Sequence, residues 1–158
     1  VFALLPAAFQ GLVAGGGPDA PVLHAYAREL GIADRIRFVG LLDDPLPAYQ
    51  AMSVFCFVSR YEPFGLTVAE AMACEVPVVG FSCPGGTGEI LTSDTGEVIQ
   101  DRDVQRMAMV VQSACRRDPP WPARIANARQ RLDERFNWDH SVAKLAALYQ
   151  SMLEQDSR

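Results

Sequence analysis

Lysine and long apolar runs are both scarce in this sequence. Among its 158 residues Lys144 is the single lysine, and the formal net charge at pH 7 is −5. A nucleic-acid groove needs a basic stripe to neutralise phosphates, so we expect no nucleic-acid partner. No segment approaches the roughly 18 consecutive apolar residues that a membrane span requires. A small anionic ligand remains compatible with this charge, because helix N-termini bind phosphate without a basic side chain.

Cysteine and histidine are also few, and their spacing does not suit a metal site. The four cysteines contain no C-x-x-C pair, and the two histidines, His24 and His140, are isolated. A zinc ribbon or a redox pair is therefore not expected. We predict no metal, no cofactor and reduced thiols, as in a cytoplasmic protein.

What the sequence does contain is a regular alternation of short apolar runs and helical stretches. We expect strands at residues 11–14, 36–39, 54–58, 77–81 and 97–99. We expect helices at 18–30, 46–52, 66–74, 103–116, 122–135 and 139–153, with a brief helix around 89–91. This order predicts an α/β fold with a mostly parallel, Rossmann-like sheet flanked by helices and a helical C-terminal tail.

Finer expectations follow from the same patterns. The run at 54–58 is apolar on both faces, which predicts a central strand covered by helices. The helix at 18–30 carries an apolar stripe of Val22, Leu23, Tyr26 and Leu30. Asp139 is expected to cap the last helix. We divide the chain into a domain at 1–136 and a C-terminal helix at 137–158.

Glycine-rich or polar loops follow four of the expected strands directly. They are residues 15–17, Gly40, residues 59–65 and residues 82–88. Parallel sheets bind ligands beyond the carboxyl ends of their strands. We therefore expect these loops to form one site at that edge.

The first of these loops fits the dinucleotide pattern G-x-G-x-x-[GA] over residues 15–20. That fingerprint also needs an acid at the end of the second strand, where Gly40 or Leu41 stands. A nicotinamide-dependent oxidoreductase is thus an alternative that lacks its ribose-binding acid. The glycines otherwise form a plain tight turn, or a turn that lets the phosphates of a ligand approach the backbone.

Two carboxylates flank the turn at Gly65. Glu62 lies on the loop before it, and Glu70 lies one turn into the helix that follows. The N–H groups of Gly65, Leu66 and Thr67 are expected to point outward and bind an anion. The carboxylate of Glu70 can accept two hydrogen bonds from a vicinal diol such as a ribose. Alternatively, both acids complement the helix dipole and cap the helix.

Residues 59–91 read SRYEPFGLTVAEAMACEVPVVGFSCPGGTGEIL. This stretch closely resembles the signature of retaining glycosyltransferases of the GT-B fold, in the large family 4 group. Residues 12–42, which include GGGP and RIRFVG, and residues 135–153, which end in LYQSML, resemble other parts of the same family. The resemblance implies that the chain is the C-terminal, donor-binding half of a GT-B fold.

The resemblance also implies roles for matching residues. It places Glu62 beside the donor sugar as the catalytic group and Glu70 on the donor ribose. The expected contacts to sugar and diphosphate come from Phe64, Gly65 and Leu66, with Thr67 beside them at the helix start. The phosphate side is assigned to Gly16 and Gly17, and the base to Gly40, Leu41 and Leu42. Arg60, on the same loop as Glu62, completes the predicted substrate-binding residues.

The activity implied is transfer of a hexose from a nucleotide diphosphate sugar to a glycan or lipid-linked acceptor, with retention. Stabilisation of the departing diphosphate would supply most of the catalysis. We expect the family's diphosphate-binding Arg and Lys and its acceptor-binding domain to precede Val1. The helix at 137–158 would pack toward that domain, and the parent would associate peripherally with the inner face of the membrane. A non-catalytic nucleotide- or sugar-binding module is the main alternative.

One departure from the family concerns Glu75, which stands where a glycine is usual. Glycine tolerates a left-handed backbone at a helix end, whereas glutamate does so poorly. We expect local strain or a shifted turn at Glu75, without loss of the site.

Overall fold

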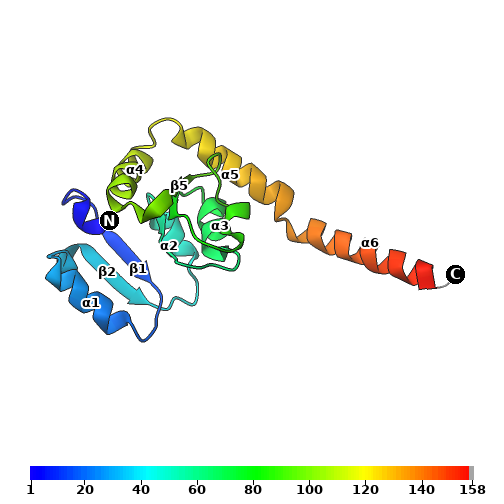
Figure 1. The fold of residues 1–158 in the computed structure, drawn as a ribbon, viewed down its shortest axis with the longest axis horizontal. Coiled ribbons are helices and arrows are strands. Elements are labelled where there is room, and N and C mark those ends of the chain that lie inside the picture. Colours follow the sequence, from blue (N-terminus) through cyan, green and yellow to red (C-terminus); the bar gives the residue numbers. More distant parts are fainter. Residues whose placement is uncertain (157–158) are drawn as a thin grey trace.

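The computed structural model describes residues 1–156, and Figure 1 shows its α/β architecture. The strands are β1 (Gly11–Ala14), β2 (Ile36–Gly40), β3 (Phe55–Phe57), β4 (Val78–Phe81) and β5 (Glu97–Ile99). The α-helices are α1 (Ala20–Glu29), α2 (Leu46–Ala51), α3 (Leu66–Ala73), α4 (Val104–Arg116), α5 (Trp121–Arg135) and α6 (Trp138–Asp156). Short 3₁₀ helices are η1 (Phe2–Leu4), η2 (Ala33–Arg35), η3 (Gly86–Glu89) and η4 (Gln100–Arg102). The expected order of elements is confirmed, with differences at their ends.

All strand pairs are parallel, as expected, but they form two sheets instead of one. In the first sheet β1 pairs with β2, with Gly11 opposite Ile36. In the second the order is β3-β4-β5, with Phe55 opposite Val78. The crossover helix α1 connects β1 to β2, and the crossover helix α3 connects β3 to β4. Each brings the chain back beside the strand that precedes it, so the two connected strands pair. The connection from β2 through α2 instead leads away, and β1 and β3 share no hydrogen-bond ladder.

The core is built around β4, whose four residues are all buried. On one face Val79 and Phe81 pack with Met107 of α4. On the other face Val78 packs with Met72 of α3. Full burial of a side chain such as Val78 contributes about 1.5–3 kcal/mol. These contacts fix α3 against the sheet, and α3 carries the Gly65 turn at its start.

Two faces that their apolar pattern marks for burial are exposed instead. The strand expected to be central is β3, which lies at an edge of its sheet with Cys56 exposed. On α1 the residues Val22 and Tyr26 are 65% and 55% exposed. That helix packs on its sheet through His24, whose ring lies 4.0 Å from that of Phe38. An apolar pattern shows that a face can be buried, but the partner that buries it must be present in the fold.

The last helix, α6, leaves the body as a single projecting element (Figure 1). Its first turn is capped by Asn137, whose Oδ1 accepts from the N–H of His140 at 3.2 Å. The expectation that Asp139 is the cap is wrong, because Asp139 already lies inside the first turn. Apolar side chains such as Trp138 and Tyr149 are 78% and 58% exposed along it. Among the described helices none is long and apolar enough to cross a membrane.

Candidate functional site

The turn at Gly65 is shaped by a backbone conformation that favours glycine. Gly65 has φ 104° and ψ 45°, in the left-handed region, and is the N-cap residue of α3. A side chain there would be strained, and its Cβ would lie 3.3 Å from Oγ1 of the buried Thr87. Behind the turn, Val68 and Met72 are buried and hold α3 against the sheet. The start of α3 is therefore presented on a rigid support.

The start of α3 offers two free N–H groups. The N–H of Gly65 donates to Oε1 of Glu62 at 3.2 Å, and the N–H of Val68 donates to the carbonyl of Gly65 at 3.0 Å. Within the described chain, no acceptor receives the N–H groups of Leu66 and Thr67, and both residues are exposed. The expectation that the N–H of Gly65 also points outward is wrong, because the carboxylate of Glu62 takes that donor. Leu66 and Thr67 keep the anion-binding geometry of a helix N-terminus.

The loop that carries Glu62 is joined to the loop after β4. Glu62 and Gly85 form an isolated parallel bridge, and the N–H of Gly86 donates to the carbonyl of Pro63 at 2.9 Å. Gly85 has φ 116°, and a Cβ on it would collide with the carbonyl of Glu62. The glycines at 85 and 86 are therefore required for the close approach of the two loops. This approach fixes the position of Glu62 relative to α3.

The second acid, Glu70, is held by a residue that the sequence patterns did not single out. The hydroxyl of Tyr49, on α2, donates to Oε2 of Glu70 at 2.8 Å. Tyr49 is 6% exposed, and its ring packs edge-on against Phe55 with centroids 5.7 Å apart. Burial raises the pKa of the Tyr49 hydroxyl, and the hydrogen bond to Glu70 raises it further. A tyrosine at a buried helical position needs an acceptor, and that requirement was the available signal.

The loops after β1 and β2 also lie together. The N–H of Gly15 donates to the carbonyl of Gly40 at 2.7 Å, and both glycines have positive φ. Gly16 lies against Leu41, since a Cβ on Gly16 would be 3.1 Å from Cγ of Leu41. Leu41 is 83% exposed and Leu42 37% exposed. Together with the exposed Gly17, these residues form the first loop pair.

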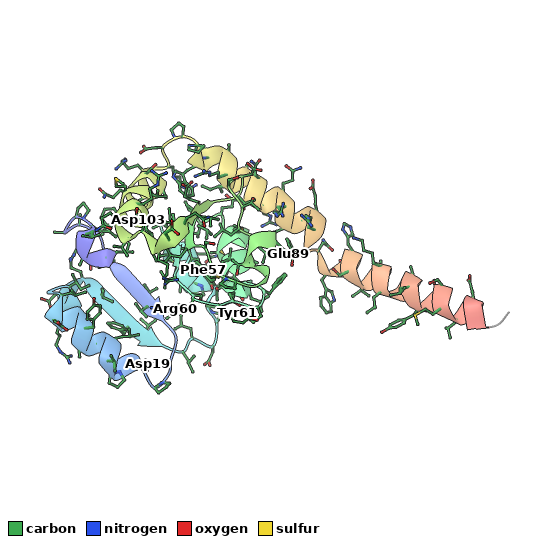
Figure 2. The ribbon with its side chains drawn as sticks, viewed as in Figure 1. Asp19, Phe57, Arg60, Tyr61, Glu89 and Asp103 are labelled. Atoms are coloured by element: carbon green, nitrogen blue, oxygen red, sulfur yellow. The ribbon has the colours of Figure 1, made fainter. Side chains whose placement is uncertain are left out.

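The predicted site residues thus fall into two groups, one at 15–17 and 40–42 and one around α3. Among residues 1–156 no hydrogen bond or ion pair joins the two groups. Arg60 is exposed and is unpaired within the described structure. Figure 2 shows Arg60, Tyr61 and Asp19 toward the same side of the body, the side to which the arrows of β1 and β2 point. Phe64 is engaged differently, with its ring edge-on to Phe136 at 5.6 Å.

A second residue that the sequence patterns did not indicate is Arg102. Its Nη2 donates to the carbonyl of Val58 at 2.8 Å, and its Nη1 donates to that of Ser59 at 3.1 Å. The guanidinium also lies 4.6 Å from the ring centroid of Phe81. Arg102 therefore supports the end of β3, where the loop with Arg60 begins.

The strain expected at Glu75 is confirmed. Glu75 has φ 57°, in the left-handed region that glutamate rarely occupies. As for metals, no group of three His, Cys, Asp or Glu side chains in the described part of the chain is placed to hold an ion.

Parallel, Rossmann-like sheets with a helix start at the carboxyl ends of the strands are typical of α/β proteins that bind a ligand at this edge. More specifically, the fold of this chain is that of the C-terminal half of a GT-B protein. The chain belongs to the family described as glycosyl transferases group 1, whose sequence model matches residues 2–117. The family resemblance read from the motifs is thereby confirmed.

Named relatives agree with this assignment. The chain is 33% identical to the lipopolysaccharide core biosynthesis mannosyltransferase LpsB of Rhizobium meliloti (strain 1021), over 97% of this chain and 46% of LpsB. It is 31% identical to the GDP-mannose-dependent alpha-(1-6)-phosphatidylinositol monomannoside mannosyltransferase of Mycobacterium tuberculosis, over 85% of this chain and 37% of that protein. The crystal structure of Anabaena HepE in complex with UDP superposes with a TM-score of 0.84 at 26% identity, over 95% of this chain and 43% of HepE. The chain thus spans less than half the length of these proteins.

Proposed function

We propose that this chain is the donor-binding half of a retaining hexosyltransferase. The parent would move a hexose from a nucleotide diphosphate sugar to a glycan or lipid-linked acceptor. The observation that carries the proposal is the start of α3, where free N–H groups of Leu66 and Thr67 lie between two held carboxylates. This arrangement suits a diphosphate at the helix start, with a sugar beside Glu62 and a ribose on Glu70.

In this proposal each acid has a separate task. Glu62 keeps Oε2 available for the donor sugar while Oε1 caps Gly65, so its orientation is fixed before the donor binds. Glu70 is exposed and keeps Oε1 available for the ribose hydroxyls. Fixed charges and dipoles aimed at the reacting groups need little reorganisation during the reaction, which is the main source of electrostatic catalysis.

The remaining predicted contacts complete the donor site. Gly16 and Gly17 would allow close approach of the phosphates, and the loop of Gly40, Leu41 and Leu42 would lie against the base. Arg60 is the exposed cation of the loop that bears Glu62, and it would neutralise part of the diphosphate charge. The last helix, α6, would pack toward the acceptor-binding domain of the parent protein. We place the parent in the cytoplasm at the inner face of the membrane, where lipid-linked acceptors are reached.

The similar proteins suggest two nucleotides for the donor, with guanine or uracil as the base. One relative is named for GDP-mannose, and HepE was crystallised with UDP and with UDP-glucose. The test is a thermal-shift and calorimetry panel of UDP, GDP, ADP and their hexose conjugates, with inorganic phosphate as control. A ligand present at 100 times its Kd should stabilise the chain by about 2.7 kcal/mol. We expect one nucleoside diphosphate to raise the Tm and phosphate alone to have little effect. If every nucleotide leaves the Tm and the calorimeter trace unchanged, the proposed function is wrong.

A further inference from the structure

Tyr49 is a buried polar residue to which the proposed function assigns no role. It lies on α2, which packs against α3, and its ring is enclosed by the apolar cluster that contains Met72 and Phe55. Its hydroxyl reaches out of that cluster to Oε2 of Glu70 at 2.8 Å. The hydroxyl has one proton to donate, and the carboxylate is its acceptor. The pair joins α2 to the exposed outer face of α3.

We propose that Tyr49 is a positioning residue that holds the carboxylate of Glu70 in the orientation required to bind the two ribose hydroxyls of the donor. This inference rests on the proposed function, because the ribose is its ligand. The hydrogen bond from Tyr49 uses one lone pair of Oε2 and leaves Oε1 and the second lone pair of Oε2 without a donor in the described part of the chain. A vicinal diol donates two hydrogen bonds, and the unoccupied lone pairs of a fixed carboxylate can accept both.

The geometry makes this restraint effective. Glu70 is exposed, so without an anchor its side chain would sample several rotamers and would lose that freedom when a ligand binds. Packing restrains Tyr49, since the residue is 6% exposed and its ring lies edge-on against Phe55. Because burial raises the pKa of the Tyr49 hydroxyl, the phenol stays protonated and donates throughout the physiological pH range. The ordering of Glu70 is thus completed during folding rather than during binding.

The same contact connects the two ends of the donor site. The helix that carries Tyr49 begins at Leu46, a few residues after the loop of Gly40, Leu41 and Leu42. The N–H of Leu46 donates to Oδ1 of Asp44 at 3.0 Å, which orders the intervening turn. Tyr49 therefore links the ribose-binding acid to the helix that follows the loop proposed for the base.

The test compares the affinity of Tyr49→Phe and of the unaltered chain for whichever of UDP, GDP and ADP binds, and for the 2′,3′-dideoxy form of that nucleotide. Phenylalanine keeps the ring and removes the donor. We expect about a tenfold loss of affinity for the ribose form and little change for the dideoxy form. In a Glu70→Ala background, Tyr49→Phe should cause no further loss. Tyr26→Phe on α1, whose side chain is 55% exposed, is the matched control and should leave both affinities unchanged.

Each result decides the matter. If Tyr49→Phe weakens the ribose and dideoxy forms equally, Tyr49 only supports the packing of α2 and the inference fails. If it weakens neither while the Tm falls, the inference also fails, although the proposed function stands. If the unaltered chain binds none of UDP, GDP and ADP, the proposed function is overturned and the inference with it. A loss confined to the ribose form, and absent from the Glu70→Ala background, establishes the positioning role.

Discussion

The carboxylate of Glu62 caps the backbone of Gly65, with 3.2 Å between Oε1 and the amide nitrogen. A capping contact and a ligand-binding role for this acid are therefore compatible, since the cap uses one oxygen. Glu70 repeats the arrangement with Tyr49 as its donor. In both acids the protein engages one oxygen and presents the other.

Glu70 should respond differently to its two simplest substitutions. Glu70→Ala removes the acceptor of the buried Tyr49 hydroxyl, which should lower the free energy of unfolding by about 1–3 kcal/mol while the fold survives. Loss of the charged partner of a ribose diol should weaken nucleotide binding by about 1.5–3 kcal/mol. Glu70→Gln keeps an acceptor oxygen, so its stability should fall less, although its affinity should still drop. Urea unfolding and calorimetry test both variants. Unchanged nucleotide affinity in Glu70→Ala would contradict the assignment of Glu70 to the ribose.

Gly65→Val should abolish nucleotide binding. Its φ of 104° strains any side chain, by about 1–3 kcal/mol, and the new atoms would lie at the helix start beside Leu66. Gly31→Ala is the matched control, because Gly31 also has positive φ, has no neighbour within 4 Å of a Cβ and lies outside the proposed site. We expect both variants to lose stability and only Gly65→Val to lose binding. Normal nucleotide affinity in Gly65→Val would show that the phosphates bind elsewhere.

Gly85→Ala should separate the two loops that meet at Glu62. The added methyl group collides with the Glu62 carbonyl, in addition to about 1–3 kcal/mol of backbone strain at φ 116°. Gly88→Ala, in the same segment, meets nothing within 4 Å and should change the free energy of unfolding by less than about 0.5 kcal/mol. Urea titration of both variants measures the difference. Equal stabilities would mean that the bridge between Glu62 and Gly85 is not important for the loop.

Cys56 should be accessible yet slow to react. Its side chain is exposed, while protein atoms crowd the thiol, and this desolvation raises its pKa to about 11. At pH 8 only roughly 0.1% of such a thiol is thiolate, against roughly a quarter of an ordinary cysteine. Because the thiolate of a thiol with a higher pKa is also more nucleophilic, alkylation of Cys56 by iodoacetamide, followed by mass spectrometry, should be roughly ten times slower than that of an ordinary exposed cysteine at pH 8. Its rate should climb until about pH 11, and a plateau below pH 9 would contradict the raised pKa.

Sugar transfer is not expected from this chain alone. Holding donor and acceptor together in reacting geometry is worth about 7–11 kcal/mol of barrier, and the proposed acceptor site lies in another domain. The test is incubation of the chain with radiolabelled UDP- and GDP-hexoses and a mixed glycan and lipid acceptor extract. We expect nucleotide binding without turnover. Steady transfer that Glu62→Ala abolishes would show that the chain is a complete catalyst.

The elements were predictable because their signals are local. The helix expected at residues 66–74 is α3 (Leu66–Ala73), since its start follows a glycine turn and its apolar residues repeat at helical spacing. The strain at Glu75 was expected because the family resemblance puts a glycine there, and a glycine tolerates a left-handed backbone at a helix end. Both depend on residues only a few positions apart in the chain.

What escaped prediction depends on contacts between distant segments. The division into two sheets is decided by which strands meet in space, and an apolar run does not specify its neighbour. The contact from Tyr49 to Glu70 spans 21 positions and has no sequence motif. For Glu62 the chemistry allowed both a cap and a ligand contact, and only the geometry shows that the cap is formed.

The two sheets share no backbone ladder, so their amides can exchange with solvent through separate opening events. Opening β4 would expose Val78 and Val79, which are fully buried. Opening β1 would uncover less new apolar surface, because Leu12 and Val13 are already 38% and 37% exposed. The first sheet therefore lies toward the low end of the chain's local stabilities. A nucleotide that contacts both the first loop pair and the start of α3 would restrict the opening of this sheet. Part of its binding free energy would offset the entropy lost in that ordering.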